Sequence, residues 1–182
     1  MNEWTTIDAY GVVTEPATLT IQRVLPGPIE RVWDYLTKSD LRRQWLAAGD
    51  MAMAVGAPFE FVWRNDELEN AGQRPDGFSE EHRLESRITE LDPPHRIGFE
   101  WGSSGGVTIQ LEEQSGNVLL TLVHRRLPDR EMLLKVAAGW HAHLDVLAAK
   151  ASGGAVPPFW AHWSQLHGEY DRRVPRSDEE GQ

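Results

Sequence analysis

The chain has 182 residues, of which 40% are hydrophobic and 25% are charged, and its formal net charge at pH 7 is −10. This length and composition are typical of one globular domain that is large enough to enclose a core and a cavity. The negative charge argues against a nucleic-acid partner, and the absence of cysteine excludes disulfides, thiolate catalysis and cysteine-bound zinc.

The first residues, MNEWTTIDAYGVV, contain no basic segment followed by an apolar one, so we expect no secretory signal. No apolar run approaches the roughly 20 residues of a membrane-spanning helix. We therefore expect a cytoplasmic protein without membrane insertion. The eight tryptophans indicate large apolar surfaces in a core, a pocket or an interface.

Residues 1–16 show no periodicity and are expected to form an irregular leader. The core, residues 17–152, opens with the strand-like alternation of ATLTIQRVL. Pro28 suits the first turn of a short helix, and Ser39 or Asp40 is predicted to cap a second one. The apolar side of the first of these helices is made by Ile29, Val32, Trp33 and Leu36.

Five later segments alternate apolar and polar side chains, as antiparallel strands with one covered face do. They are FEFVWRN, HRLESRITEL, HRIGFEW, VTIQLEE and VLLTLVHRRL. A polar loop at 66–80 and short turns, among them GSSGG at 102–106, connect them. GSSGG also matches a nucleophile-elbow pattern, but it lies between two strands and is predicted to be a hairpin turn.

A long helix follows the strands. Asp129 is predicted to cap it and Gly153 to end it after about Ser152. Its apolar stripe consists of Leu133, Val136, Trp140, Leu144 and Leu147. A further helix is expected at 157–173, and a disordered tail at 174–182.

These elements predict a single α+β domain of the helix-grip class. A curved antiparallel sheet of about six strands would wrap around the long C-terminal helix, with two short helices after the first strand. Because one helix rarely fills the concave side of such a sheet, we expect a ligand cavity between them.

The chain also resembles a known family. The motifs LPGPIERVWDYLT, RRQWLA, ESRITELDPPHRIGFEW, VLLTLVHRRL and AAGWHAHLDVLAA occur in the order seen in SRPBCC (START-like) proteins of the bacterial Hsp90-ATPase-activator-homologue (AHSA1-like) group. The resemblance spans roughly residues 17–150 and implies the helix-grip fold. It implies no particular reaction, because members of this superfamily include lipid binders, cyclases and oxygenase domains.

The pair His141 and His143 raises the question of a metal site. On a helix the two rings would lie about 160° apart, so they cannot chelate one ion. We expect His141 to face solvent beside Asp145, and His143 to reach the edge of the cavity. We predict no metal, no cofactor and no catalytic residue.

His124 and His82 are both expected on the covered face of the sheet. An interior histidine held by hydrogen bonds is one interpretation, and a ligand-binding or catalytic imidazole is the other. The aromatic strand residues likewise allow either a packed core or an aromatic cavity.

The functional hypothesis is that the cavity binds a small hydrophobic or amphipathic molecule. The alternatives are a cyclase- or hydrolase-type enzyme that uses cavity histidines, and an interaction module like the Hsp90 co-chaperone. A chaperone partner is not favoured, because the co-chaperone's separate N-terminal domain has no counterpart here. Trp160, Trp163 and Tyr170 can either pack on the domain or form the interface of a homodimer. The predicted ligand-binding residues are Phe59, Phe61, Trp63, His82, Leu84, Ser86, Phe99, Trp101, Ile109, Leu122, His124, Val136, Trp140 and His143.

Overall fold

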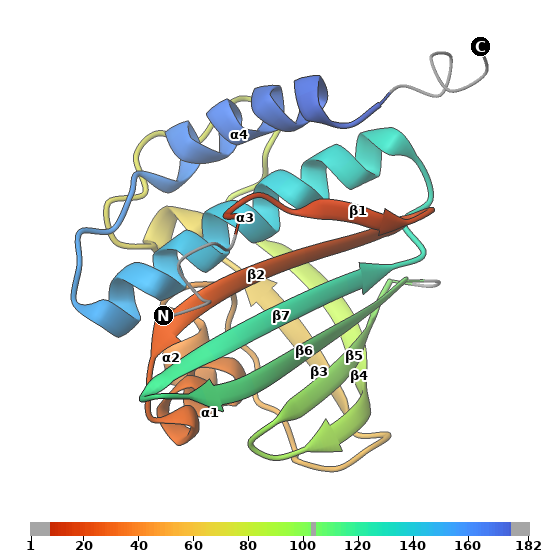
Figure 1. Cartoon of the computed structure of the whole chain (residues 1–182). Helices are drawn as coiled ribbons and strands as arrows, with labels where there is room; N and C mark the ends of the chain where they lie inside the picture. Colours follow the sequence, from red (N-terminus) through yellow and green to blue (C-terminus); the bar gives the residue numbers. More distant parts are fainter. Residues whose placement is uncertain (1–7, 103–104, 176–182) are drawn as a thin grey trace.

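The computed structural model describes residues 8–102 and 105–175. Within these residues, seven strands form one antiparallel sheet in the order β1-β2-β7-β6-β5-β4-β3, with four α-helices (Figure 1). The strands are β1 (Val12–Glu15), β2 (Thr18–Pro26), β3 (Pro58–Trp63), β4 (His82–Asp92), β5 (Arg96–Trp101), β6 (Gly105–Gln114) and β7 (Asn117–Arg125). The helices are α1 (Ile29–Thr37), α2 (Ser39–Arg42), α3 (Arg130–Ser152) and α4 (Phe159–Arg173).

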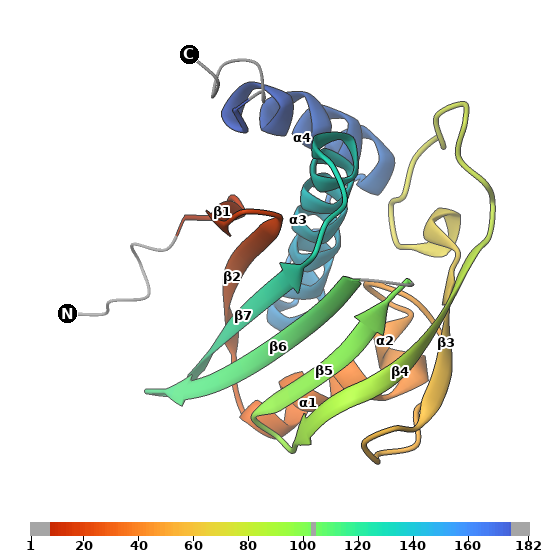
Figure 2. The ribbon, with the colours of Figure 1, turned by 90° about the vertical axis from the view of Figure 1, so that its right-hand side faces the viewer.

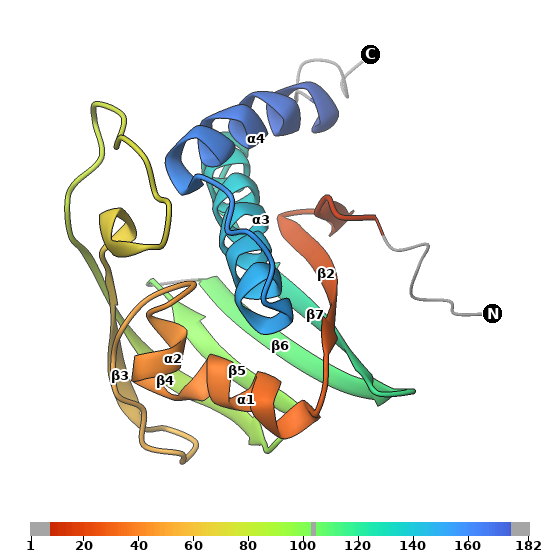
Figure 3. The same ribbon diagram turned by 90° about the vertical axis from the view of Figure 1, so that its left-hand side faces the viewer.

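The sheet curves around α3, which lies along its concave side (Figures 2 and 3). Helices α1 and α2 lie across one end of the curved sheet, and α4 packs on the side of α3 that faces away from the sheet. This arrangement confirms the predicted helix-grip fold. None of the described helices is both long and apolar enough to cross a bilayer.

The ends of α3 follow local sequence signals. The Met132 backbone N–H donates a hydrogen bond of 2.8 Å to the Asp129 carboxylate, which caps the N-terminus as predicted. Gly153 takes the left-handed conformation, with φ of 76°, that ends the helix. The predicted cap of α2 is wrong: the Ser39 hydroxyl accepts a hydrogen bond from the Gly49 N–H instead, because the chain folds back over α2.

The N-terminal segment differs from expectation. Within the predicted irregular leader, residues 12–15 form β1, which pairs Val12 with Thr20 of β2 and adds an edge strand to the sheet. All four residues of β1 are exposed, so the strand has no buried side to give an alternating pattern. The predicted tail lies outside the described residues from position 176 on, as do residues 103–104 of the predicted turn.

A buried arginine fixes the connection between α2 and β3. Arg42 is 1% exposed, and its guanidinium donates to the backbone oxygens of Leu36, Ala47 and Gly49. Burial lowers its pKa to about 10, which still leaves it charged at neutral pH. Because the planar guanidinium donates hydrogen bonds to three carbonyl oxygens, Arg42 links the end of α1 to the segment that leads into β3.

We expect Arg42→Met to lower the free energy of unfolding by about 3 kcal/mol or more, because it leaves buried carbonyls without donors. Urea unfolding followed by circular dichroism would measure this. The exposed Arg43→Met variant is the control, and equal stability of the Arg42 variant and the wild type would contradict the role given to this residue.

Candidate functional site

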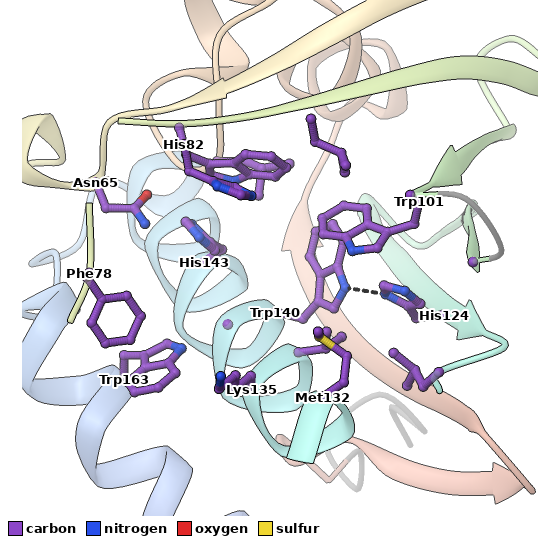
Figure 4. A pocket seen from close by; sticks show the side chains of 18 of the residues that line it. Asn65, Phe78, His82, Trp101, His124, Met132, Lys135, Trp140, His143 and Trp163 are labelled. Atoms are coloured by element: carbon purple, nitrogen blue, oxygen red, sulfur yellow. Dashed lines mark hydrogen bonds between the residues drawn. The ribbon is translucent and has the colours of Figure 1, made fainter. Parts of the chain in front are cut away.

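A pocket of about 660 Å³ opens at the end of the sheet where β3, β5 and β7 finish (Figure 4). Trp63, Trp101 and His124 line it from the ends of these strands, and Trp140 lines it from α3. Its remaining walls come from the loop between β3 and β4 and from α4. The volume falls within the roughly 300–1,000 Å³ of small-molecule sites.

Many of the residues predicted from sequence line this pocket. They are Trp63, His82, Leu84, Trp101, His124, Val136, Trp140 and His143. They come from the ends of four strands, β3, β4, β5 and β7, and from the facing side of α3. The structure therefore brings together the strand and helix residues that the cavity hypothesis requires.

Other predicted residues lie in the core, away from the pocket walls, and for them the structure corrects the predicted site. They are Phe59, Phe61, Ser86, Phe99, Ile109 and Leu122. Phe61 is fully buried, with ring centroids 4.9 Å from Phe59 and 5.2 Å from Phe99, so side chains fill the space there. The Ser86 hydroxyl donates to the Glu100 carbonyl oxygen at 2.8 Å and is thereby occupied.

The predicted ligand-binding residues included none from the loop or from α4. Phe78, the one aromatic residue of the polar loop at 66–80, lies with its ring centroid 5.1 Å from Trp160 and 4.9 Å from Trp163. All three side chains line the pocket. A single aromatic residue in a polar loop could have indicated this contact from the sequence, because such a side chain usually packs against another apolar group.

His124 is one of the polar residues that line the pocket. The Trp140 indole N–H donates a hydrogen bond of 3.0 Å to His124 Nδ1 (Figure 4). Indole nitrogen is only a donor, so Nδ1 must be the acceptor and the proton of the neutral ring resides on Nε2. His124 Nε2 is buried and has no hydrogen-bond partner among the described residues. An imidazole that lines the pocket thus has a buried N–H donor that lacks an acceptor.

His143 has the opposite tautomer. Its Nδ1 lies 2.7 Å from the backbone oxygen of Trp45, which can only accept, so Nδ1 carries the proton. Nε2 of the neutral ring is then an unprotonated acceptor. Burial lowers the pKa of His143 to about 4, and burial lowers that of His124 to about 4 as well. Both imidazoles are therefore neutral at pH 7.

Asn65 supplies a third polar group. Its side-chain oxygen is buried and has no hydrogen-bond partner within the described residues. Asn65 and His143 lie on one side of the pocket, whereas His124 and Trp101 lie on the other (Figure 4). Apolar side chains make up most of the lining, and Ser79, Glu80, Arg126 and Lys135 also contribute to it.

Two histidines are placed differently from the prediction. His82 is exposed at the pocket rim, with its ring 5.6 Å from that of Trp63, because β4 begins there beyond the covered part of the sheet. His141 was expected in solvent but is 4% exposed, because α4 packs over that side of α3. His141 and His143 do diverge around the helix: they contact Tyr170 and Trp45, respectively.

Gly139 explains part of the free space. It lies inside α3 on the pocket wall, where glycine costs about 1 kcal/mol relative to alanine. A Cβ atom at this position would lie 3.8 Å from the nearest side-chain atom, Nε1 of Trp163. The missing side chain therefore keeps the pocket open between α3 and α4.

Comparison with known proteins supports the fold. Residues 26–151 match the family described as Activator of Hsp90 ATPase homolog 1-like protein. A Bordetella parapertussis protein solved by NMR is 34% identical, with 97% of each chain covered and a TM-score of 0.78. CalU16 from Micromonospora echinospora is 19% identical, with 85% of this chain and 86% of that chain covered and a TM-score of 0.63. An Enterococcus faecalis protein of unknown function is 20% identical, with 87% and 86% covered and a TM-score of 0.65. No curated protein matches the chain.

The buried histidines make the stability depend on pH. Their folded pKa values of about 4 lie below the ordinary 6.5, so the unfolded chain binds these protons first on acidification. Their contribution is complete above pH 6.5 and is lost as the pH falls toward 4, by roughly 3 kcal/mol per histidine. We expect His124→Gln to flatten this pH dependence by about half.

Urea unfolding at intervals between pH 7 and pH 4.5 measures the slope. The variant of an exposed histidine, His95→Gln, should keep the wild-type slope. A His124→Gln slope that equals the wild-type slope would show that His124 is not held neutral in the folded protein.

Proposed function

Because the chain belongs to the family of Activator of Hsp90 ATPase homolog 1-like proteins, we propose that the pocket in its helix-grip fold is a ligand-binding site. The ligand would be a small, mainly apolar molecule that has a hydrogen-bond acceptor. The observation that carries this proposal is the buried, unpartnered N–H of His124, a residue that lines a mainly apolar pocket. A buried donor without an acceptor costs about 1–3 kcal/mol, which a carbonyl or ether oxygen of a ligand would recover.

The walls define the rest of the ligand. Trp63, Trp101, Trp140 and Trp163 present ring faces and edges that suit a flat aromatic or alicyclic body. Asn65 and His143, on the far side, suit a second polar group such as a hydroxyl, which can donate to the unprotonated Nε2 of His143. We therefore infer a ligand with an apolar body and an oxygen at each of two ends.

The residues that line the pocket also indicate which part of the chain is needed for binding. The match to the family ends at residue 151, yet α4 contributes Trp160 and Trp163 to the wall. Trp160 donates its indole N–H to the Asp66 carboxylate at 2.9 Å, which joins α4 to the loop between β3 and β4. We propose that residues 17–173 act as one domain in binding.

The geometry supports binding better than catalysis by His124. A general base must present an unprotonated nitrogen to the substrate, but His124 has Nδ1 engaged by Trp140 and a proton on Nε2. Its pKa of about 4 also makes it a weak base at neutral pH. A donor role toward an oxygen of the ligand matches both properties.

We expect Gly139→Leu to weaken binding of the fluorescent probe 8-anilinonaphthalene-1-sulfonate by about tenfold or more, which corresponds to about 1.4 kcal/mol. The leucine side chain would project into the space that Gly139 leaves open between α3 and α4. Fluorescence titration of the probe measures the affinity, and circular dichroism verifies the helix content.

Gly168→Leu is the matched control, because Gly168 also lies inside a helix but does not line the pocket. It should bind the probe with wild-type affinity. If both variants bind the probe as the wild type does, or if the wild type does not bind it, the pocket is not the binding site that we propose.

A further inference from the structure

A second cluster of polar side chains lies outside the pocket, between α3, α4 and β2. His141 and Asp145 are one turn apart on α3, and His162 approaches them from the first turns of α4. One possible ligand atom from each of the three residues lies within 4.8 Å of the other two. From this geometry we propose that His141, Asp145 and His162 bind a divalent transition-metal ion of the Zn²⁺ type.

The distances are close to those of a metal site. Asp145 Oδ2 lies 2.7 Å from His162 Nε2 and 3.4 Å from His141 Nε2. Zinc–nitrogen and zinc–oxygen distances of about 2.0–2.2 Å place the ligand atoms of a tetrahedral site roughly 3.3 Å apart. A shift of the partly exposed His162 ring by a fraction of an ångström would therefore bring it to the spacing from Asp145 that two metal ligands require. Two imidazoles and one carboxylate are a ligand set that zinc accepts.

The surrounding groups orient these ligands. The Tyr170 hydroxyl lies 2.9 Å from His141 Nδ1 and can accept its N–H, which leaves Nε2 free for a metal. Arg23 donates to Asp145 Oδ1 at 3.0 Å, which leaves Oδ2 for the ion. Tyr170 is itself held by the Gly11 N–H at 2.7 Å. His141 and Asp145 thus each have an outer partner on the side away from the cluster.

The charges set the expected strength. Arg23 lowers the electrostatic attraction of the site for a cation, because its guanidinium neutralises part of the Asp145 carboxylate charge. The Asp145 and His162 side chains are 26% and 25% exposed, so water can reach a fourth coordination position. We therefore expect one Zn²⁺ to bind with micromolar affinity.

Metal binding would also act on the pocket. The ion would join α3 to α4, and α4 supplies Trp160 and Trp163 to the pocket wall. Because a metal that binds only the folded chain stabilises it by mass action, saturating Zn²⁺ should raise the melting temperature.

The test uses untagged, chelator-treated full-length protein titrated with ZnCl₂ by isothermal calorimetry. We expect one equivalent to bind and His162→Ala or Asp145→Asn to weaken binding by roughly tenfold or more, since loss of even an outer partner of a metal ligand costs 10–100-fold. The same variants should lose the increase in melting temperature. His167→Ala, on the same helix but outside the cluster, should behave as the wild type.

Three results would overturn the proposal: no saturable binding at one equivalent, unchanged binding in His162→Ala, or an equal loss in His167→Ala. Circular dichroism of each variant verifies folding, and His162→Gln provides a conservative second variant. Failure of zinc binding would leave the separate proposal for the apolar pocket unaffected, because the two sites share no residue.

Discussion

The hydrogen bond from the Trp140 indole to His124 Nδ1 determines the chemistry of the pocket. It joins α3 to β7 and assigns the proton of the neutral imidazole to Nε2. Burial lowers the pKa of this histidine to about 4, so the ring remains neutral at physiological pH. A donor of fixed position is thereby maintained in a mainly apolar pocket, and the proposed recognition of a ligand oxygen rests on this donor.

The space around this donor arises from the fold. A seven-stranded sheet curves more widely than one helix can fill, and the aromatic side chains of β3 and β5 fill only the interior part. At the end of the sheet, Gly139 leaves room beside α3, while the loop that contains Phe78 and helix α4 close the outer side. Binding space, apolar walls and the polar groups therefore come from different parts of the chain that meet at one end of the domain.

The periodicity of the sequence predicted those structural features that depend only on residues close together in the chain. The alternation of the strands, the Asp129 cap and the Gly153 terminus are local and appear as expected. Phe61 and Trp101 share the same inward alternation, yet one is core and the other lines the pocket, because their distance from the end of the sheet decides this. The burial of His141 and its approach to His162 depend on where α4 packs, which helical periodicity within α3 does not encode.

The most direct test of the donor role is a nitrogen NMR spectrum of ¹⁵N-histidine-labelled protein at pH 7, assigned with a His124→Gln variant. We predict that His124 Nδ1 has the chemical shift of an unprotonated nitrogen and Nε2 that of a protonated one. The same spectrum of Trp140→Phe should lose this preference, because the indole N–H that enforces it is gone. A proton on Nδ1, or on both nitrogens, in the wild-type protein would contradict the account.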